Sequence, residues 1–455
     1  MPRIKNIIAR EILDSRGNPT VETRIALDNG IAARASAASA CSFCAPGAVG
    51  LKDNDKKRYN GMGVLKAVEN VNKVIGSKLV GLEAEEQEKI DKLMIELDGT
   101  ENKKKLGANA ILSVSLACAR VAAKSCKKEL YEYIGTKFQI PPARTTVQSV
   151  GNPKSQGLPV PCFNMFNGGE HGDTNLDFKE YMVIPLMSGS SAATPLTPDP
   201  FPAHASRARG AEIKSFSDMV RMGAEIYHEL GRVLKEAGYD TDTGTEGGYA
   251  PDMHSSIQAM ELIMAAGVRA GYKPGEDFGL GIDIGSGSLY NKETGKYIFK
   301  LDQANFTSAN LTGLYYEWFR KYPIVYLEDG LSADDLSGWK DLTRSLGPEI
   351  ALAGDNFFAA GIKRVREALK EKIANTVVLK PGQAGTLTET IECALLAKKH
   401  GYKIAVSARG GETNDDFISD LAVALGAEYF KAGSLSRGER VSKYNRLMEI
   451  EENVK

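Results

Sequence analysis

The chain has 455 residues, with 57 Lys and Arg against 58 Asp and Glu, so its formal net charge is -1. This even balance provides no field that would hold nucleic acid or an anionic membrane. No apolar run approaches the roughly 20 residues needed to span a bilayer, and the N-terminus lacks the apolar core of a signal peptide. Six cysteines scattered over this length are typical of reduced thiols, so we expect a cytoplasmic protein.

The N-terminal residues 1–135 are predicted to form a separate α+β capping domain. Strands, separated by the turn signals SRGNP and DNG, are expected over residues 4–15, 20–29 and 31–39. The helical segments that follow cover residues 65–79, 84–98 and 108–134. After them, residues 136–158 are rich in Pro, Gly, Ser and Thr, which favours an interdomain linker.

The C-terminal half contains five apolar runs that each end on one chemically useful residue and then a glycine or turn: Asp283, Glu328, Asp355, Lys380 and Arg409. The runs do not alternate in polarity, as expected for parallel strands buried on both faces, and amphipathic helical segments separate them. We therefore predict an α/β fold in which residues 159–455 form a parallel (β/α)8-type barrel. A Pro- and Ser-rich stretch at about 188–212 is too long for an ordinary barrel connection and is interpreted as an inserted loop.

Catalytic groups of such barrels lie at the C-terminal ends of the strands. The strand ends of this chain carry three carboxylates, a lysine and an arginine. This set predicts a metal site with a base beside it, and hence an enzyme. One capping aspartate would be ordinary, but acids at three successive strand ends favour a metal over helix capping. Cys41 and Cys44 form a single CxxC with no second pair, so a zinc or redox function is a weaker alternative.

Several long motifs occur in a fixed order along nearly the whole chain: EILDSRGNPTVE, MIELDGTENKKKLGANAILSVSLA, FNGGEHG, EGGYAP, YLEDGL and SRGERVSKYNRLMEIEE. Together they resemble the enolase family, which dehydrates 2-phosphoglycerate to phosphoenolpyruvate. The resemblance implies an α+β cap, a modified (β/α)8 barrel, dependence on Mg2+ and a homodimer or larger ring.

The resemblance also implies the roles of the reacting residues. Asp283, Glu328 and Asp355 match the ligands of Mg2+, a cation that requires hard oxygen ligands. Lys380 matches the general base, whose pKa we expect Lys431 and the metal to lower. Concentrated positive charge is needed because a proton next to a carboxylate is very weakly acidic.

The acid and the substrate-binding groups follow from the same resemblance. Glu246 matches the acid that protonates the departing hydroxide, and Glu180 matches its partner, so one of the two carboxyls should have a raised pKa. His171 matches an active-site histidine, although a lone histidine is more often structural. The predicted substrate-binding residues are Arg409, which suits phosphate, and Lys431, Ser39, Ser42 and Gly410.

The chain departs from the family at the site itself. The mobile loop SGASTG reads SACSFC at residues 39–44, and GDEGG reads GTEGG, which places Thr245 beside Glu246. SHRSGE reads SARGGE, so Ala408 and Gly410 replace a histidine and a phosphate-contacting serine. Other departures are Asn356, Gly382 and Ala432. Because the proton-abstraction residues are retained and the changed residues are mostly smaller, we expect added space around the phosphoryl group.

Three functions are left open by the sequence. The first is a hydratase acting on 2-phosphoglycerate. The second is a relative diverted to a phosphonate or nucleotide-activated analogue, similar to the carboxyphosphonoenolpyruvate synthases of phosphinothricin-type pathways. The third is a non-catalytic binding protein that retains the fold. In the first two cases the partner is a small phosphorylated or phosphonylated carboxylic acid, with neither nucleic acid nor a membrane involved.

Overall fold

The computed structural model describes residues 1–39, 47–141, 157–186, 213–358 and 361–454. The predicted inserted loop, most of the predicted linker, the CxxC pair and Ser42 lie outside these residues. Among the described residues, no helix is both long enough and apolar enough to cross a membrane.

The N-terminal part begins with the predicted antiparallel sheet, whose strands are β1 (Ile4–Leu13), β2 (Pro19–Leu27) and β3 (Ala32–Ser36). Its helices are α1 (Leu65–Glu69), α2 (Gly76–Leu79), α3 (Gln87–Asp98), α4 (Ala108–Ser125) and α5 (Leu130–Lys137). A π-helical turn, Asn70–Ile75, joins α1 to α2. Helix α4 is apolar on most sides because it packs against β2 and β3 and also against α3 and α5.

The helical stretch predicted over residues 108–134 is two helices rather than one. Lys127 has a φ of 54°, and this left-handed conformation cannot continue an α-helix of L-residues. Helix α5 then begins with a capping box formed by Glu129 and Glu132, which satisfies backbone donors of its first turn.

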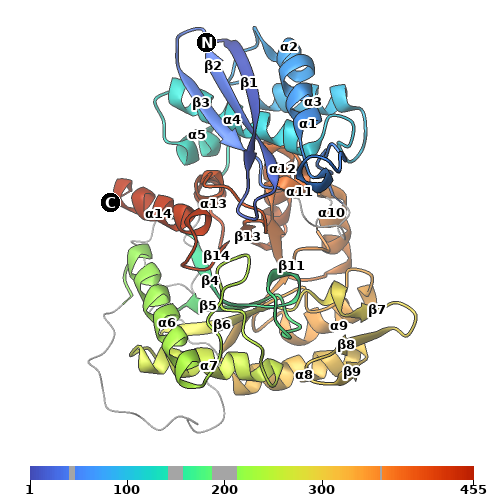
Figure 1. The fold of residues 1–455 in the computed structure, drawn as a ribbon, viewed down its shortest axis with the longest axis vertical. Helices are drawn as coiled ribbons and strands as arrows, with labels where there is room; N and C mark the ends of the chain where they lie inside the picture. The colour runs from blue at the N-terminus through green and yellow to red at the C-terminus, as the bar shows by residue number, and fades with distance from the viewer. Residues whose placement is uncertain (40–46, 142–156, 187–212, 359–360, 455) are drawn as a thin grey trace.

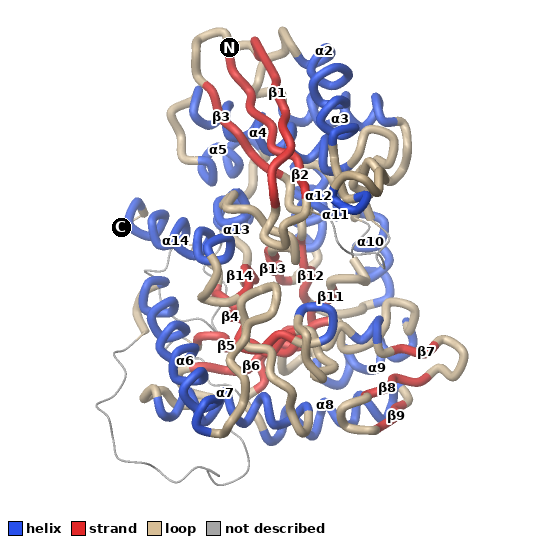
Figure 2. Tube along the Cα trace, in the orientation of Figure 1, coloured by secondary structure: helices blue, strands red, loops and turns tan. Residues whose placement is uncertain are grey.

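The C-terminal part is a closed barrel of eight described strands (Figures 1 and 2). Around the barrel they are β4 (Val160–Asn167), β5 (Glu180–Pro185), β6 (Phe278–Asp283), β10 (Ile324–Glu328), β11 (Ala351–Gly354), β12 (Thr376–Leu379), β13 (Lys403–Ser407) and β14 (Tyr429–Gly433). Strand β14 pairs with β4 and closes the barrel. This closed barrel with an α+β cap confirms the predicted fold class.

The barrel departs from the parallel arrangement of its other strands at one strand. Strand β5 runs antiparallel to both of its neighbours, β4 and β6. The connection from β4 to β5 contains only a short 3-10 turn, Gly169–His171, and a parallel crossover would require a longer segment that is usually a helix. As a consequence, β5 begins at the rim where its neighbours end.

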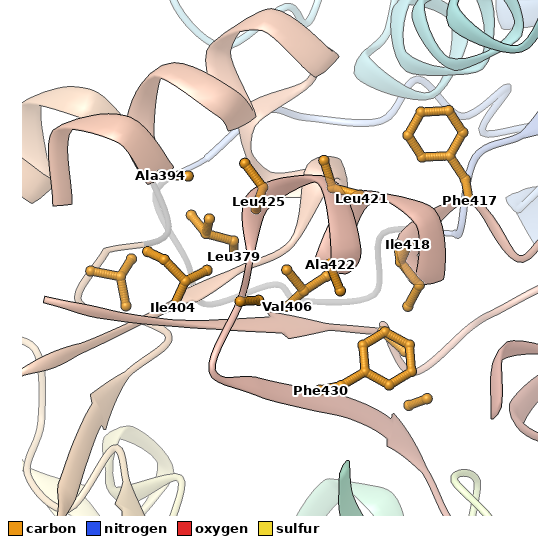
Figure 3. Packing of buried hydrophobic residues seen from close by; sticks show 14 of the residues in the cluster. Leu379, Ala394, Ile404, Val406, Phe417, Ile418, Leu421, Ala422, Leu425 and Phe430 are labelled. Atoms are coloured by element: carbon orange, nitrogen blue, oxygen red, sulfur yellow. The ribbon is translucent and has the colours of Figure 1, made fainter. Parts of the chain in front are cut away.

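The outer layer consists of helices: α6 (Phe216–Glu236), α7 (Ser256–Arg269), α8 (Ser308–Lys321), α9 (Leu336–Leu346), α10 (Ile362–Glu371), α11 (Pro381–Ala384), α12 (Leu387–Lys399), α13 (Phe417–Leu425) and α14 (Gly438–Asn453). A small sheet of β7 (Tyr290–Asn291), β8 (Lys296–Phe299) and β9 (Ala304–Phe306) lies outside the barrel. In Figure 3, Ile418 and Ala422 of α13 face Val406 and Phe430 on the strands, so burial of apolar surface fixes this helix on the barrel.

The N-terminal part lies against one end of the barrel, and the β1–β2 hairpin reaches toward it (Figure 1). At the hairpin turn, the Ser15 amide donates a 2.7 Å hydrogen bond to the Glu412 carbonyl in the loop after β13. Arg120 of α4 adds ion pairs to Asp415 and Asp416 in the same loop. The capping part is thereby held over the rim that carries the strand-end residues.

Candidate active site

The three predicted metal-binding acids lie on neighbouring strands. Asp283 ends β6 and Glu328 ends β10, and the two residues are direct partners in the parallel register. Asp355 directly follows β11, the next strand around the barrel. All three are buried. The strand order therefore brings these carboxylates to a single arc of the rim.

Lys431, on β14 across the barrel, makes the densest set of charge contacts at this rim. Its Nζ lies 2.6 Å from Glu328 Oε2, 3.3 Å from Asp283 Oδ2 and 3.3 Å from Glu180 Oε2. Burial works to lower the pKa of Lys431, but the three carboxylates outweigh it and raise the pKa well above its ordinary value. Lys431 is therefore a fixed positive charge at the centre of the site.

Lys380 follows β12 and precedes the short helix α11. Its Nζ donates a 2.6 Å hydrogen bond to Asp355 Oδ2. Burial works to lower the pKa of Lys380, yet Asp355 and Glu328 outweigh both burial and the repulsion from Lys431, so the pKa lies above its ordinary value. This direction is opposite to the expected one, because the carboxylates beside Lys380 outweigh the repulsion from Lys431.

A second group of side chains lies at the same rim. Because β5 is antiparallel, its first residue, Glu180, pairs in register with both Asn167 and Asp283. His171 Nδ1 lies 3.5 Å from Glu246 Oε1 and 3.7 Å from Glu180 Oε1. The ligand-type atoms of His171, Glu180 and Glu246 all lie within 4.8 Å of one another, so this group could also hold a cation.

The ionisation of this second group suits proton transfer. Burial raises the pKa of Glu180 to about 7, helped by Glu246 and Asp283 and opposed by Lys431. One carboxyl of the predicted pair thus has the raised pKa, and it is Glu180. Burial lowers the pKa of His171 to about 4, although Glu180 opposes this, so the imidazole is neutral near pH 7. A neutral imidazole can orient the carboxyls but adds no positive charge.

The residues present fit a hard divalent cation at the strand-end acids. Glu328 Oε2 accepts hydrogen bonds from Tyr326 and Lys431, whereas Glu328 Oε1 is buried and has no hydrogen-bond partner. A buried oxygen without a hydrogen-bond partner destabilises the folded state by about 1–3 kcal/mol unless a donor or a cation binds it. Lys380 and Lys431 pair with four acidic side chains here, so carboxyl oxygens are crowded at this point. Burial, helped by Asp283 and opposed by Lys431, raises the pKa of Glu328 well above its ordinary value. A divalent cation would offset this crowding, and carboxylate oxygens are the ligands that Mg2+ requires.

Arg409 and Gly410 follow β13 at the other side of the rim. The Arg409 carbonyl accepts a 2.9 Å hydrogen bond from Arg440, and the Gly410 carbonyl accepts one of 2.8 Å from the same guanidinium. An added Cβ at Gly382 would lie 3.1 Å from Arg409 Cδ, so the Arg409 side chain passes over this glycine. The backbone of Arg409, the residue predicted to bind phosphate, is therefore held in place by Arg440.

The expected empty space beside Gly410 is occupied. An added Cβ there would lie 1.9 Å from Nη2 of Arg16, a residue of the β1–β2 turn. Ser39 lies nearby: its hydroxyl donates to Asp14, and its amide donates a 2.8 Å hydrogen bond to the Gly411 carbonyl. Ser39 is thus placed at the contact between the two parts of the chain, while Ser42 lies outside the described residues.

Sequence reasoning missed three further residues of the site. Gln383 donates a 3.0 Å hydrogen bond to Asp355 Oδ1 and so orients that carboxylate. Asp329 accepts hydrogen bonds from the Asp355 and Asn356 amides, and burial followed by the charges of Asp355 and Asp283 raises its pKa to about 7. Lys179 precedes Glu180, and an added Cβ at Gly285 would lie 2.5 Å from its side chain. The sequence signal that could have identified Lys179 was its position directly before Glu180.

Comparison with known families agrees with this architecture. A model described as the enolase N-terminal domain matches residues 4–134. A model described as the enolase C-terminal TIM barrel domain matches residues 155–194 and 208–455. These matches cover most of the chain and support an enolase-type lyase in general terms.

Proposed function

We propose, from the premise that this chain belongs to the enolase family, that it is a Mg2+-dependent lyase acting on 2-phosphoglycerate or a close analogue. The reaction removes the proton alpha to the substrate carboxylate and eliminates water, which gives an enolpyruvate product. The observation that carries the proposal is the strand-end cluster in which Lys380 and Lys431 pair with four buried carboxylates and one Glu328 oxygen has no partner.

The first step is the transfer of the alpha proton to Lys380 Nζ. Mg2+ held by Asp283, Glu328 and Asp355 would supply positive charge that stabilises the substrate carboxylate as its proton leaves. Lys431 adds a second positive charge at a fixed place, since three carboxylates hold its ammonium. Lys380 serves as base only when its own proton has left, so its ion pair with Asp355 must loosen beforehand.

The second step breaks the bond between the beta carbon and the hydroxyl oxygen. The departing hydroxide takes a proton from the Glu180 and Glu246 pair and leaves as water, while the electrons of the former C–H bond form the new double bond. A carboxyl whose pKa is about 7, as for Glu180, keeps its proton for part of the time at neutral pH. The neutral imidazole of His171 lies 3.5 Å from Glu246 and leaves the charge of this pair unchanged.

The test uses the purified chain with Mg2+ and 2-phosphoglycerate. Turnover is followed by the absorbance of the enolpyruvate product, and removal of the alpha proton is followed separately by NMR as exchange in D2O. Turnover supports the proposal for 2-phosphoglycerate itself. Exchange without turnover supports an analogue as substrate, and the absence of both supports the non-catalytic alternative.

A diverted substrate remains the second candidate because the departures lie near the phosphate-binding arginine rather than at the base. Residue 410 is glycine where the family has serine, and residue 245 is threonine where the family has aspartate. A phosphonylated or otherwise more anionic carboxylic acid, as in the carboxyphosphonoenolpyruvate synthases, fits that pattern. By analogy with the family, we also propose that the chain forms a homodimer or a larger homo-oligomer.

A further inference from the structure

Arg16 occupies the position where the family's phosphate-contacting serine would project. Besides the 1.9 Å contact to Nη2, an added Cβ at Gly410 would lie 2.7 Å from Arg16 Cζ. Contacts this short are not tolerated, so any side chain at residue 410 would displace the guanidinium. The glycine at 410 and the placement of Arg16 are therefore coupled features of this chain.

The guanidinium of Arg16 has no counter-charge among the described residues. Its closest polar contact is a weak 3.4 Å hydrogen bond from Nη2 to the Thr245 hydroxyl, and its Nε is buried without a hydrogen-bond partner. An acid at position 245, as in the family's GDEGG form, would be placed to pair with this cation. Arginine stays charged at any ordinary pH. Arg16 therefore carries hydrogen-bond donors that are not all paired and a positive charge that no described carboxylate neutralises.

The backbone that carries Arg16 is rigidly placed. The Arg16 amide donates a 2.8 Å hydrogen bond to Asp14 Oδ1, and Arg437 donates one of 2.9 Å to the Ser15 carbonyl. The contacts of the side chain, Gly410 and Thr245, are the sequence neighbours of Arg409 and Glu246. Arg16 therefore lies beside the residues that adjoin the proposed phosphate-binding arginine and the proposed acid.

We propose that Arg16 is a specificity-determining residue that binds an oxyanion of the substrate as a second guanidinium beside Arg409. This proposal rests on the function proposed above and adds its substrate class: a carboxylic acid whose phosphoryl, phosphonyl or added carboxylate oxygens extend toward the β1–β2 turn. Thr245 leaves the charge of Arg16 uncompensated, Gly410 provides its space, and a planar guanidinium forms paired charge-assisted hydrogen bonds with such groups.

The experiment compares Arg16→Ala and Thr245→Asp with the parent and with Arg34→Ala, an exposed arginine of the same sheet. The probes are 2-phosphoglycerate and inorganic phosphate, each titrated by calorimetry in the presence of Mg2+. Both site variants should weaken binding by about tenfold or more, which corresponds to about 1.4 kcal/mol. Arg34→Ala should match the parent. In turnover assays of the two site variants, KM should rise by a larger factor than kcat falls. Arg16→Lys should recover part of the affinity.

Circular dichroism identifies any variant that fails to fold, and Thr245→Asp tests the same charge without removing Arg16. Unchanged affinity for both probes in both folded variants overturns the role of Arg16 while leaving the proposed function standing. If the parent neither binds nor turns over 2-phosphoglycerate, the proposed function fails for that substrate. The phosphate titration then decides the role of Arg16, and a parent that binds neither probe overturns it.

Discussion

The strand-end rim of the barrel and the contact between the capping part and the barrel form opposite sides of one site, but they are built differently. At the rim, Asp283, Glu328 and Lys431 come from the ends of barrel strands, and the strand order alone brings them together. At the contact, Arg16 and Gly410 meet only because a hairpin turn from the start of the chain packs against a loop near its end. The rim retains the residues proposed for proton abstraction and metal binding, whereas two departures, Thr245 and Gly410, lie at the contact with Arg16.

This difference suggests that the two regions have separable tasks. Chemistry that requires charges at fixed places is carried by a rigid scaffold, while recognition is carried by loops that can change without disturbing it. A substitution at the rim should therefore affect the reaction itself. A substitution at the contact should affect substrate affinity or the fit between the two parts of the chain. The following predictions test that separation.

The largest expected effect is on proton abstraction. Lys380→Ala should lower the rate of alpha-proton exchange of 2-phosphoglycerate by about 10²–10⁴-fold, because a positioned base contributes about that much. Mg2+ affinity should not fall, since the substitution removes a cation that pairs with Asp355. NMR in D2O measures the exchange and calorimetry measures Mg2+ binding. Lys73→Ala, in an exposed ion pair with Glu69, is the matched control. Exchange within tenfold of the parent would reject Lys380 as the base.

The second prediction concerns the cation at the same rim. In the parent, Mg2+ at 100 times its dissociation constant should raise the free energy of unfolding by about 2.7 kcal/mol. Glu328→Gln should abolish this increase, because an amide lacks the charge of the buried carboxylate beside Asp283. Thermal unfolding with and without Mg2+ measures the effect, and Glu349→Gln, at an exposed position, is the control. Equal stabilisation of the parent and Glu328→Gln would remove Glu328 from the ligand set.

The third prediction concerns the contact region. Gly410→Ser should lower the free energy of unfolding by up to about 1 kcal/mol, because the new side chain overlaps the end of the flexible Arg16 side chain, which must move aside. In an Arg16→Ala background the same substitution should cost much less, since the space is then free. Denaturant unfolding of both single variants and the double variant measures this coupling. Gly287→Ser is the control, because nothing lies within 4 Å of an added Cβ there. Additive effects would show that Gly410 and Arg16 are independent.

The same contrast explains which features the sequence could predict. The strand-end residues were identifiable because an apolar run and the residue that ends it are adjacent in the chain, and the barrel topology follows from their repetition. The direction of β5 depends on a short connection and on pairing partners distant in sequence. The break at Lys127 requires a left-handed lysine, for which no local sequence signal exists. The insertion of Arg16 beside Gly410 depends on how two separate parts of the chain dock, so the smaller residue was interpreted as empty space.

Asp91 gives the smallest predicted effect and lies at the same contact, away from the site. It is fully buried, and it accepts hydrogen bonds from Gln87 of its own helix and from Thr388 of barrel helix α12. Burial raises the pKa of Asp91 above its ordinary value of 3.8, against the opposing hydrogen bonds from Thr388, Ser115 and Gln87.

Because the folded state binds this proton more tightly than the unfolded state, Asp91 contributes stability that is fully present below the unfolded pKa and is lost as pH rises through the folded pKa. Asp91→Asn does not titrate, and its amide matches the surrounding donors less well. The variant should therefore be less stable than the parent at pH 4, and the deficit should shrink as pH rises. Urea unfolding between pH 4 and 8 measures this, with the exposed Asp28→Asn as control. A deficit that stays constant or grows with pH would show that Asp91 is charged in the folded chain, and that the two parts meet through a buried carboxylate rather than a protonated one.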